Sequence, residues 1–195
     1  MKIASDRSNF GGVTGLTQAE SNYAFLVGCY ALCNGRVEIE PKNGTDYTAN
    51  AGGIAGTLAN STIAGCTVKA KNIYGHNASS PSLIGVSGIA AYVVGVSSVS
   101  DCKAYATLIR NSTVLGTEDA SVTPDNLFGM GMIVGIDAGT TTVTNCGVGG
   151  SFYLGASEKP QELILTLDAD SYAKGIIGSG KTATVGGCYY WNGEE

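Results

Sequence analysis

Residues Gly175 to Thr182 match the phosphate-binding pattern G-x-x-x-x-G-K-[ST]. In nucleotide-binding proteins this loop lies between a buried strand and a helix, because backbone N–H groups at the helix N-terminus bind the phosphates. Only 13 residues follow it (195 minus 182), and they are rich in glycine and aromatic residues. No helix of useful length fits in that segment, so we predict that the chain binds no nucleotide.

Cysteine and histidine are the next residue types that could do chemistry, and the chain has six cysteines and one histidine, His76. No two cysteines have the C-x-x-C spacing of a zinc site, and a lone histidine excludes any site with two histidine ligands. His76 begins a polar segment predicted as a loop, where a solvated side chain is its ordinary role. We therefore predict neither a metal site nor another cofactor.

Carboxylates could hydrolyse a polysaccharide if two of them converged. Asp168 and Asp170 follow a predicted strand, whereas Asp101 and Asp137 lie on the repeats described below. Aspartate at a corner or in a loop commonly serves the turn itself. The sequence supports no catalytic pair, and a polysaccharide-degrading enzyme, either a lyase or a glycoside hydrolase, stays as the alternative hypothesis.

These residues are positioned by a repeat that opens with a glycine and aliphatic segment and closes with a cysteine. Its copies lie near residues 52–75, 88–109, 131–154 and 175–191, with their cysteines at Cys66, Cys102, Cys146 and Cys188. Each cysteine follows a hydroxyl residue at minus four, a β-branched residue at minus three, and Gly, Asp or Asn at minus one. Residues 1–35 are predicted to form an atypical first copy and entry cap, as the terminal repeat of a solenoid usually does.

The parity of the apolar positions indicates the path of the backbone. The residue at minus three and the cysteine would face opposite sides of one flat strand. A corner at minus one places both inside, and Gly, Asp and Asn tolerate the left-handed conformation that such a corner needs. Strand, corner and strand recur at intervals of 36, 44 and 42 residues between cysteines. We predict one all-β domain over residues 1–195, a right-handed parallel β-helix of four to five coils.

The same register constrains the thiols of Cys66, Cys102, Cys146 and Cys188. Stacked copies would place them above one another at about 4.8 Å, the spacing between neighbouring strands. Their Cα–Cβ bonds would run parallel, whereas a disulfide needs Cβ atoms about 3.8 Å apart and suitably turned. We therefore predict a buried ladder of reduced thiols; Cys33 has no place in it.

The composition fits a folded protein that neither binds nucleic acid nor spans a membrane. The chain has 29 glycines, 14% charged residues and a net charge of −5. Basic residues form no run, which argues against a nucleic-acid partner, and no apolar run reaches the roughly 18 to 20 residues that cross a bilayer. The N-terminus lacks the apolar core of a signal peptide. The alternatives are a cytoplasmic protein and a secreted one without its signal, and we expect the second.

The opening at residues 52–56, GGIAG, followed by residues 60–70, NSTIAGCTVKA, resembles the GLUG-type repeat. In that repeat a glycine, aliphatic and glycine opening precedes a segment that ends in Asn-Cys or a similar pair. Residues 142–146, TVTNC, are the best match, whereas Met132 and Ala91 replace glycines of two openings. The resemblance covers about residues 52–190. It implies a secreted or cell-surface bacterial protein, many of which are regarded as adhesins.

Function is expected at positions that face outward and differ between copies. Residues at plus one and plus three from each cysteine should face solvent, and the aromatic ones are Tyr105, Tyr189 and Trp191. Aromatic rings can bind sugar rings or partner side chains; the alternative is that Tyr189 to Trp191 cover the open end of the solenoid. We predict a non-catalytic adhesion or ligand-binding module. Its partner would be a glycan or a protein surface, contacted also by loops 110–127 and 157–161.

Overall fold

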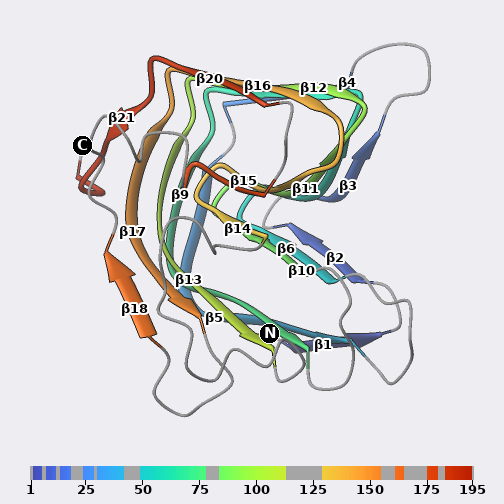
Figure 1. Ribbon diagram of the computed structural model, residues 1–195, viewed down its shortest axis with the longest axis vertical. Helices are drawn as coiled ribbons and strands as arrows, with labels where there is room; N and C mark the ends of the chain where they lie inside the picture. Colours follow the sequence, from blue (N-terminus) through green and yellow to red (C-terminus); the bar gives the residue numbers. More distant parts are fainter. Residues whose placement is uncertain are drawn as a thin grey trace.

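The computed structural model of the chain consists of β-strands and turns in the residues that it describes, and the strands form four sheets (Figure 1). The described residues are 2–5, 8–11, 14–18, 24–28, 30–41, 49–77, 84–112, 129–154, 161–164, 175–179 and 183–194. The burial and the side-chain contacts are described for residues 28, 50–73, 85–109, 129–153, 175–178 and 183–194.

The four sheets differ in strand length, and the longest strands belong to one sheet. Sheet A contains β1 (Lys2–Ser5), β5 (Tyr30–Pro41), β9 (Thr67–Asn77), β13 (Lys103–Ser112), β17 (Gly147–Leu154), β18 (Gln161–Ile164) and β21 (Tyr189–Tyr190). Sheet B contains β2 (Ser8–Gly11), β6 (Ala49–Gly52), β10 (Ile84–Ser87) and β14 (Met130–Gly131). Sheet C contains β3 (Thr14–Gln18), β7 (Ala55–Ala59), β11 (Ala90–Val94), β15 (Val134–Asp137) and β19 (Ile177–Ser179). Sheet D contains β4 (Ala24–Val27), β8 (Ser61–Ala64), β12 (Val96–Ser100), β16 (Thr140–Thr144) and β20 (Thr184–Gly186).

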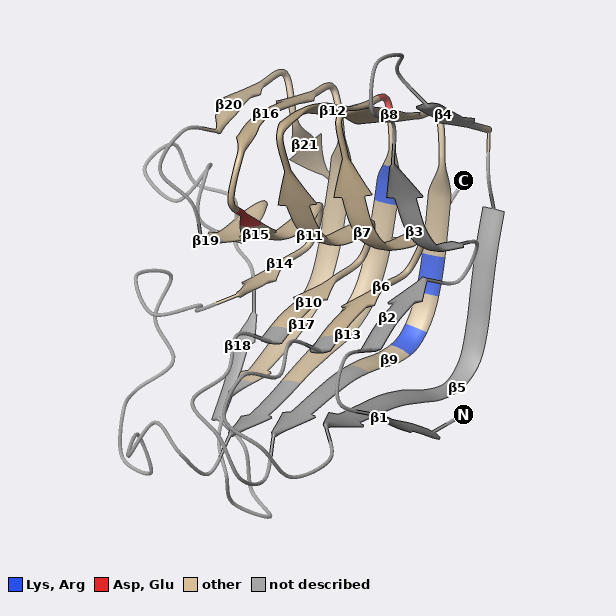
Figure 2. Cartoon of the chain, turned by 90° about the vertical axis from the view of Figure 1, so that its right-hand side faces the viewer, with Lys and Arg blue, Asp and Glu red and all other residues tan. Residues whose placement is uncertain are grey.

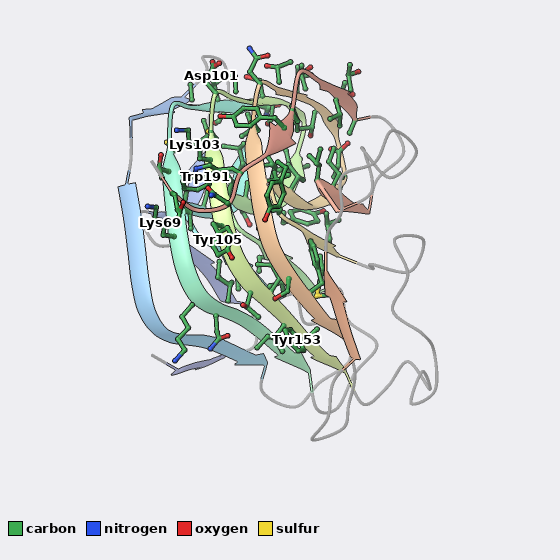
Figure 3. The ribbon with its side chains drawn as sticks, turned by 90° about the vertical axis from the view of Figure 1, so that its left-hand side faces the viewer. Lys69, Asp101, Lys103, Tyr105, Tyr153 and Trp191 are labelled. Carbon is green, nitrogen blue, oxygen red and sulfur yellow. The ribbon has the colours of Figure 1, made fainter. Side chains whose placement is uncertain are left out.

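The chain visits the sheets in the order B, C, D and A, and each round forms one coil of a solenoid. Each new coil adds a parallel strand to every sheet, as the pairing of β6, β10 and β14 in sheet B illustrates. Four coils have all four strands, and a fifth contributes β19, β20 and β21. The coils advance in a right-handed sense from the blue end to the red end (Figures 1 and 3). The prediction of a right-handed parallel β-helix of four to five coils is confirmed.

The corner between sheets D and A lies at the position immediately before each cysteine, as the sequence predicted. All four residues there have left-handed backbone: φ is 61° at Gly65, 53° at Asp101, 55° at Asn145 and 64° at Gly187. Glycine has no Cβ to clash in this conformation, and Asp and Asn tolerate it better than other residues do. Gly28 has φ of 65° at the corresponding place in the first coil, so the corner recurs in all five coils.

A second corner, between sheets C and D, was not predicted. Asn60 and Gly95 have φ of 49° and 71° there, and Val96 donates its backbone N–H to the Asn60 side chain, Oδ1, at 3.1 Å. The third coil has one more residue than the second at this corner, because Ser98 pairs with Thr62 whereas Val94 pairs with Ala59. This insertion explains why the isoleucine-to-cysteine spacing is 12 residues from Ile54 to Cys66 but 13 from Ile89 to Cys102.

The interior is a set of stacked apolar columns, one for each inward repeat position. In the second, third and fourth coils the residues at minus three and plus two from the cysteines are fully enclosed: Ile63, Val99, Val143, Val68, Ala104 and Val148. The four cysteines are buried as reduced thiols, which confirms the predicted thiol ladder. Cys66 donates its backbone N–H to the Cys102 sulfur, Sγ, at 3.4 Å, and the Cys102 thiol donates to the Ser100 carbonyl at 3.2 Å.

Two strand boundaries differ from the sequence prediction. His76 was expected in a loop, but β9 continues to Asn77 because it pairs with β13 as far as Ser112. Cross-strand pairing here overrides the polar composition. The strand predicted at residues 163–167 begins earlier, at Gln161, and this β18, described as far as Ile164, runs antiparallel to β17, which a purely parallel coil does not anticipate. Residues 113–128 and 155–160, most of the two predicted contact loops, lie outside the described residues.

Candidate ligand-binding surface on sheet A

The outer face of sheet A is built by residues that alternate with the core along β9 and β13. Cys102, immediately before β13, and Ala104 on the strand are buried, whereas Lys103 is partly exposed and Tyr105 is 38% exposed. Lys69 on β9 pairs in register with Tyr105. Because side chains of paired strands stand side by side on one face, Lys69, Lys103 and Tyr105 form a single outward group.

β17 presents glycine at the two equivalent outward positions, Gly147 and Gly149. A Cβ at Gly147 would lie 2.9 Å from the Tyr189 ring, and a Cβ at Gly149 would collide with the carbonyl oxygen of Trp191. The missing side chains therefore leave room for the C-terminal residues to pack on this strand. Trp191 is fixed there by its backbone N–H, which donates to the Val148 carbonyl at 2.8 Å.

The Trp191 indole lies across the outer face of sheet A, between the two lysines and Tyr105 (Figure 3). Lys69 Nζ and Lys103 Nζ each lie 5.5 Å from the centroid of the indole, and the Tyr105 ring meets it edge-on with centroids 6.5 Å apart. The indole N–H donates to the Glu194 carbonyl. Cations over an aromatic face and edge-to-face rings are both attractive, so these contacts hold the cluster together.

The structure brings together the three residues singled out from the sequence, but it exposes them unequally. Tyr105 is 38% exposed and Tyr189 is 44% exposed, whereas Trp191 is only 7% exposed. Trp191 covers the outer face of sheet A and meets the Tyr105 ring edge-on, whereas the Tyr189 ring lies against Gly147. Tyr190 is 56% exposed although it pairs with Val148, an inward position, so it lies on the opposite face of β21 from Tyr189.

Charge on the described surface is distributed unevenly. The three lysines whose side chains are described, Lys69, Lys71 and Lys103, all belong to sheet A (Figure 2). Asp101 lies at the corner above them and accepts a hydrogen bond from the Asn145 amide at 3.3 Å. Glu194 accepts one from the Asn192 amide at 3.1 Å. In the part of the chain whose side chains are described, neither Lys69 nor Lys103 has a carboxylate within ion-pair distance.

The described carboxylates serve turns. Asp137 ends β15 and is 6% exposed; its Oδ1 accepts hydrogen bonds from the Gly139 N–H at 3.1 Å and the Thr141 hydroxyl at 2.6 Å. Asp101 lies at a different corner, between sheets D and A. Asp168 and Asp170 lie outside the described residues. Within the described ranges, no three His, Cys, Asp or Glu side chains are grouped so as to hold a metal ion.

The segment that matches the phosphate-binding pattern is part of the solenoid where it is described. Gly175 and Ile176 form a turn, and β19 pairs with β15 in sheet C. Residues 180–182, with the lysine of the pattern, lie outside the described residues, and β20 and β21 follow them. No helix in the described parts of the chain is long and apolar enough to cross a membrane.

The thiol ladder has a structural role. Hydrogen bonding to the Cys146 and Cys66 thiols, together with burial, raises the pKa of the Cys102 thiol well above its usual value. A thiol with a raised pKa stays protonated at neutral pH and is a poor nucleophile. The Cys102 thiol is therefore part of the core packing and is distinct from the surface on sheet A.

The stacked parallel sheets define the class of the protein: it is a β-solenoid built from repeats. No protein-family model, no curated protein and no solved structure matches the chain.

Proposed function

We propose that this protein is a non-catalytic adhesion or ligand-binding module of the GLUG-repeat type, which acts at the cell surface or after secretion and binds a glycan. The family, the location and the ligand all rest on the repeat pattern and on the surface of sheet A. The solenoid supplies a rigid scaffold, and its outward positions supply the contacts.

The arrangement of Tyr105 and Tyr189 around the buried Trp191 carries this proposal. Tyrosine provides a large flat contact area with few rotatable bonds, so it binds a ligand at a small cost in conformational entropy. The Tyr105 ring is braced edge-on by Trp191, and the Tyr189 ring lies over Gly147. Rings held in this way are preorganised to pack against the apolar faces of sugars.

A glycan is favoured over a protein partner because the exposed rings lie among polar side chains. Lys69, Lys103 and Tyr105 combine apolar area with hydrogen-bond donors within one cluster. Sugar-binding surfaces need both, since each sugar ring has apolar C–H groups and several hydroxyl groups. A stable protein interface commonly has an apolar centre that is depleted in charge.

A glycan array with labelled protein, combined with an assay for release of reducing sugar ends, tests the proposal. We expect binding to a subset of glycans, loss of that binding in Tyr105→Ala, and no release of sugar ends. Release of sugar ends that depends on Asp168 or Asp170 would instead establish the polysaccharide-degrading enzyme. Binding that survives Tyr105→Ala and Tyr189→Ala would move the site away from sheet A.

A further inference from the structure

We propose that the outer face of sheet A selects acidic oligosaccharides, with Lys69 and Lys103 binding carboxylate or sulfate groups while Tyr105 and Tyr189 contact the sugar rings. This inference rests on the proposed function and names the chemical class of its ligand. An acidic sugar chain differs from a neutral one in needing cations beside the aromatic rings, and this surface has them.

The two lysines are held near each other by one aromatic ring. Each Nζ lies 5.5 Å from the centroid of the Trp191 indole, so the two nitrogens are at most 11 Å apart (5.5 plus 5.5). This is close to the screening length of about 8 to 10 Å at moderate salt, so the two positive charges still repel each other. An anionic group bound beside both lysines would relieve that repulsion, and a neutral ligand would not.

Neither lysine is neutralised by the described part of the protein. The two nearby carboxylates of the described chain, Asp101 and Glu194, accept hydrogen bonds from Asn145 and Asn192. The contacts of Lys69 and Lys103 are with the indole. A lysine over a ring keeps its hydrogen-bond donors for a ligand, because the ring attracts the charge without accepting all three N–H groups. Charge-assisted hydrogen bonds to a carboxylate or sulfate are the strongest that these groups can form.

The surroundings favour a short acidic sugar segment over a long polyanion. The net charge of the chain is −5, so a nucleic acid would be repelled by most of the molecule and attracted only by this surface. Single-stranded nucleic acids also stack on aromatic rings, which makes them the necessary competitor in the test. A sugar chain with one acidic group near each lysine needs no wider basic surface.

Titration with matched oligosaccharides tests the inference. Trp191 is the only tryptophan of the chain, so its fluorescence reports directly on this surface, and calorimetry gives an independent affinity. The probes are a galacturonate hexamer, a heparin-derived hexamer, uncharged cellohexaose and a single-stranded oligothymidylate. We expect one of the acidic sugars to bind at least about tenfold more tightly than cellohexaose, with an affinity that falls as salt is added.

Substitution of each lysine separates charge from the aromatic contacts. Lys69→Gln and Lys103→Gln should each weaken acidic binding about two- to fivefold, and the double variant about tenfold, as expected for partly exposed ion pairs. Lys71→Gln is the matched control for Lys69→Gln. Lys71 lies on β9, the same strand as Lys69, and is exposed, but it does not lie over the indole. Lys71→Gln should change the affinity less than twofold.

The possible binding results bear on different parts of the proposal. Equal binding of cellohexaose and the acidic sugars, or acidic binding that is unchanged in the double lysine variant, overturns the inference and leaves glycan binding intact. Oligothymidylate binding as tight as that of the acidic sugars overturns the choice of ligand class. Binding of none of the sugars overturns both the inference and the proposed function. Preference between the galacturonate and heparin hexamers identifies carboxylate or sulfate as the preferred group.

Discussion

The two faces of sheet A come from alternate residues of the same strands, yet they differ in almost every respect. The inner face repeats the same residue types from coil to coil: Cys66, Cys102, Cys146 and Cys188 form one column, and Val68, Ala104 and Val148 form the next. At the outer positions between these columns the residue changes in every coil. One of the two outer columns reads Lys69, Tyr105, Gly149 and Trp191.

This difference separates the residues that build the solenoid from those that could give it a function. A column in the interior must fill the same space in each coil, so its residue types are restricted by packing density. An outer position faces solvent and has no such restriction. Where the outer residues differ and also contact one another, as Lys69, Tyr105 and Trp191 do, a specific surface becomes possible.

The largest effect is expected from a cavity in the inner face. Leu108 is fully buried and pairs in register with Phe152, so Leu108→Ala should lower the free energy of unfolding by about 2 to 5 kcal/mol. Thr107→Ala alters the adjacent outer position and should change the free energy of unfolding by less than about 0.5 kcal/mol. Urea unfolding followed by circular dichroism measures both. Similar losses in the two variants would contradict the division between the faces.

The Cys102 thiol should make the free energy of unfolding depend on pH in the alkaline range. The pKa of the Cys102 thiol is raised in the folded state, so the folded protein retains a proton that the unfolded chain releases above about pH 8.5. Its stabilising contribution is therefore complete below that pH and is lost as the pH rises.

We expect the free energy of unfolding of the native protein to fall between pH 7 and 10 by about 1 to 2 kcal/mol more than that of Cys102→Ala. Urea unfolding at a series of pH values makes the comparison. Identical pH profiles for the two proteins would show that this thiol ionises as readily in the fold as in the unfolded chain.

A smaller effect on stability is expected at the corners between sheets D and A, where valine and glycine should act differently. Asp101 has φ of 53°, a conformation that β-branched residues adopt only with strain. Asp101→Val should therefore lower the thermal midpoint, at a cost of about 1 kcal/mol, whereas Asp101→Gly should leave it within a few tenths. Differential scanning calorimetry distinguishes the two. A valine that is tolerated as well as glycine would mean that the corner is not left-handed.

A small effect on stability is expected from Lys69→Gln, the substitution that should weaken binding of acidic sugars. Lys69→Gln removes one cation from the indole and leaves the core untouched, so the free energy of unfolding should change by less than about 1 kcal/mol. The urea midpoint of this variant, measured beside Lys71→Gln, provides the check. A large loss of stability would show that Lys69 is needed for folding of the solenoid and is not only a binding residue.

The features that could be predicted from the sequence are those that every coil repeats. The corner immediately before each cysteine could be predicted because only Gly, Asp and Asn occur there. The thiol ladder could be predicted because the cysteines occupy the same position in every copy of the repeat. The corner at Asn60 and Gly95 was missed because an inserted residue shifts it between coils. Among the described strands only β18 pairs in antiparallel fashion, so no repetition could indicate it.

The candidate site was only partly predictable for the same reason. Outward parity selected Tyr105, Tyr189 and Trp191, but the closeness of the indole to both lysines depends on how the C-terminal residues fold back over β17. The available signal was the pair of glycines in the outer column, Gly147 and Gly149, whose missing side chains admit that segment. A contact made once in the fold has no sequence period, so it required the structure.

The most direct test compares a change in the outer face of sheet A with a matched change in sheet D. Calorimetric titration of the best array glycan should show at least a tenfold loss of affinity in the Tyr105→Ala, Tyr189→Ala double variant, with an unfolding midpoint close to that of the native protein. Thr142→Ala, which removes an exposed hydroxyl from β16, should bind as the native protein does. Unchanged binding by the double variant, or binding lost only together with the fold, would contradict the assignment of function to this surface.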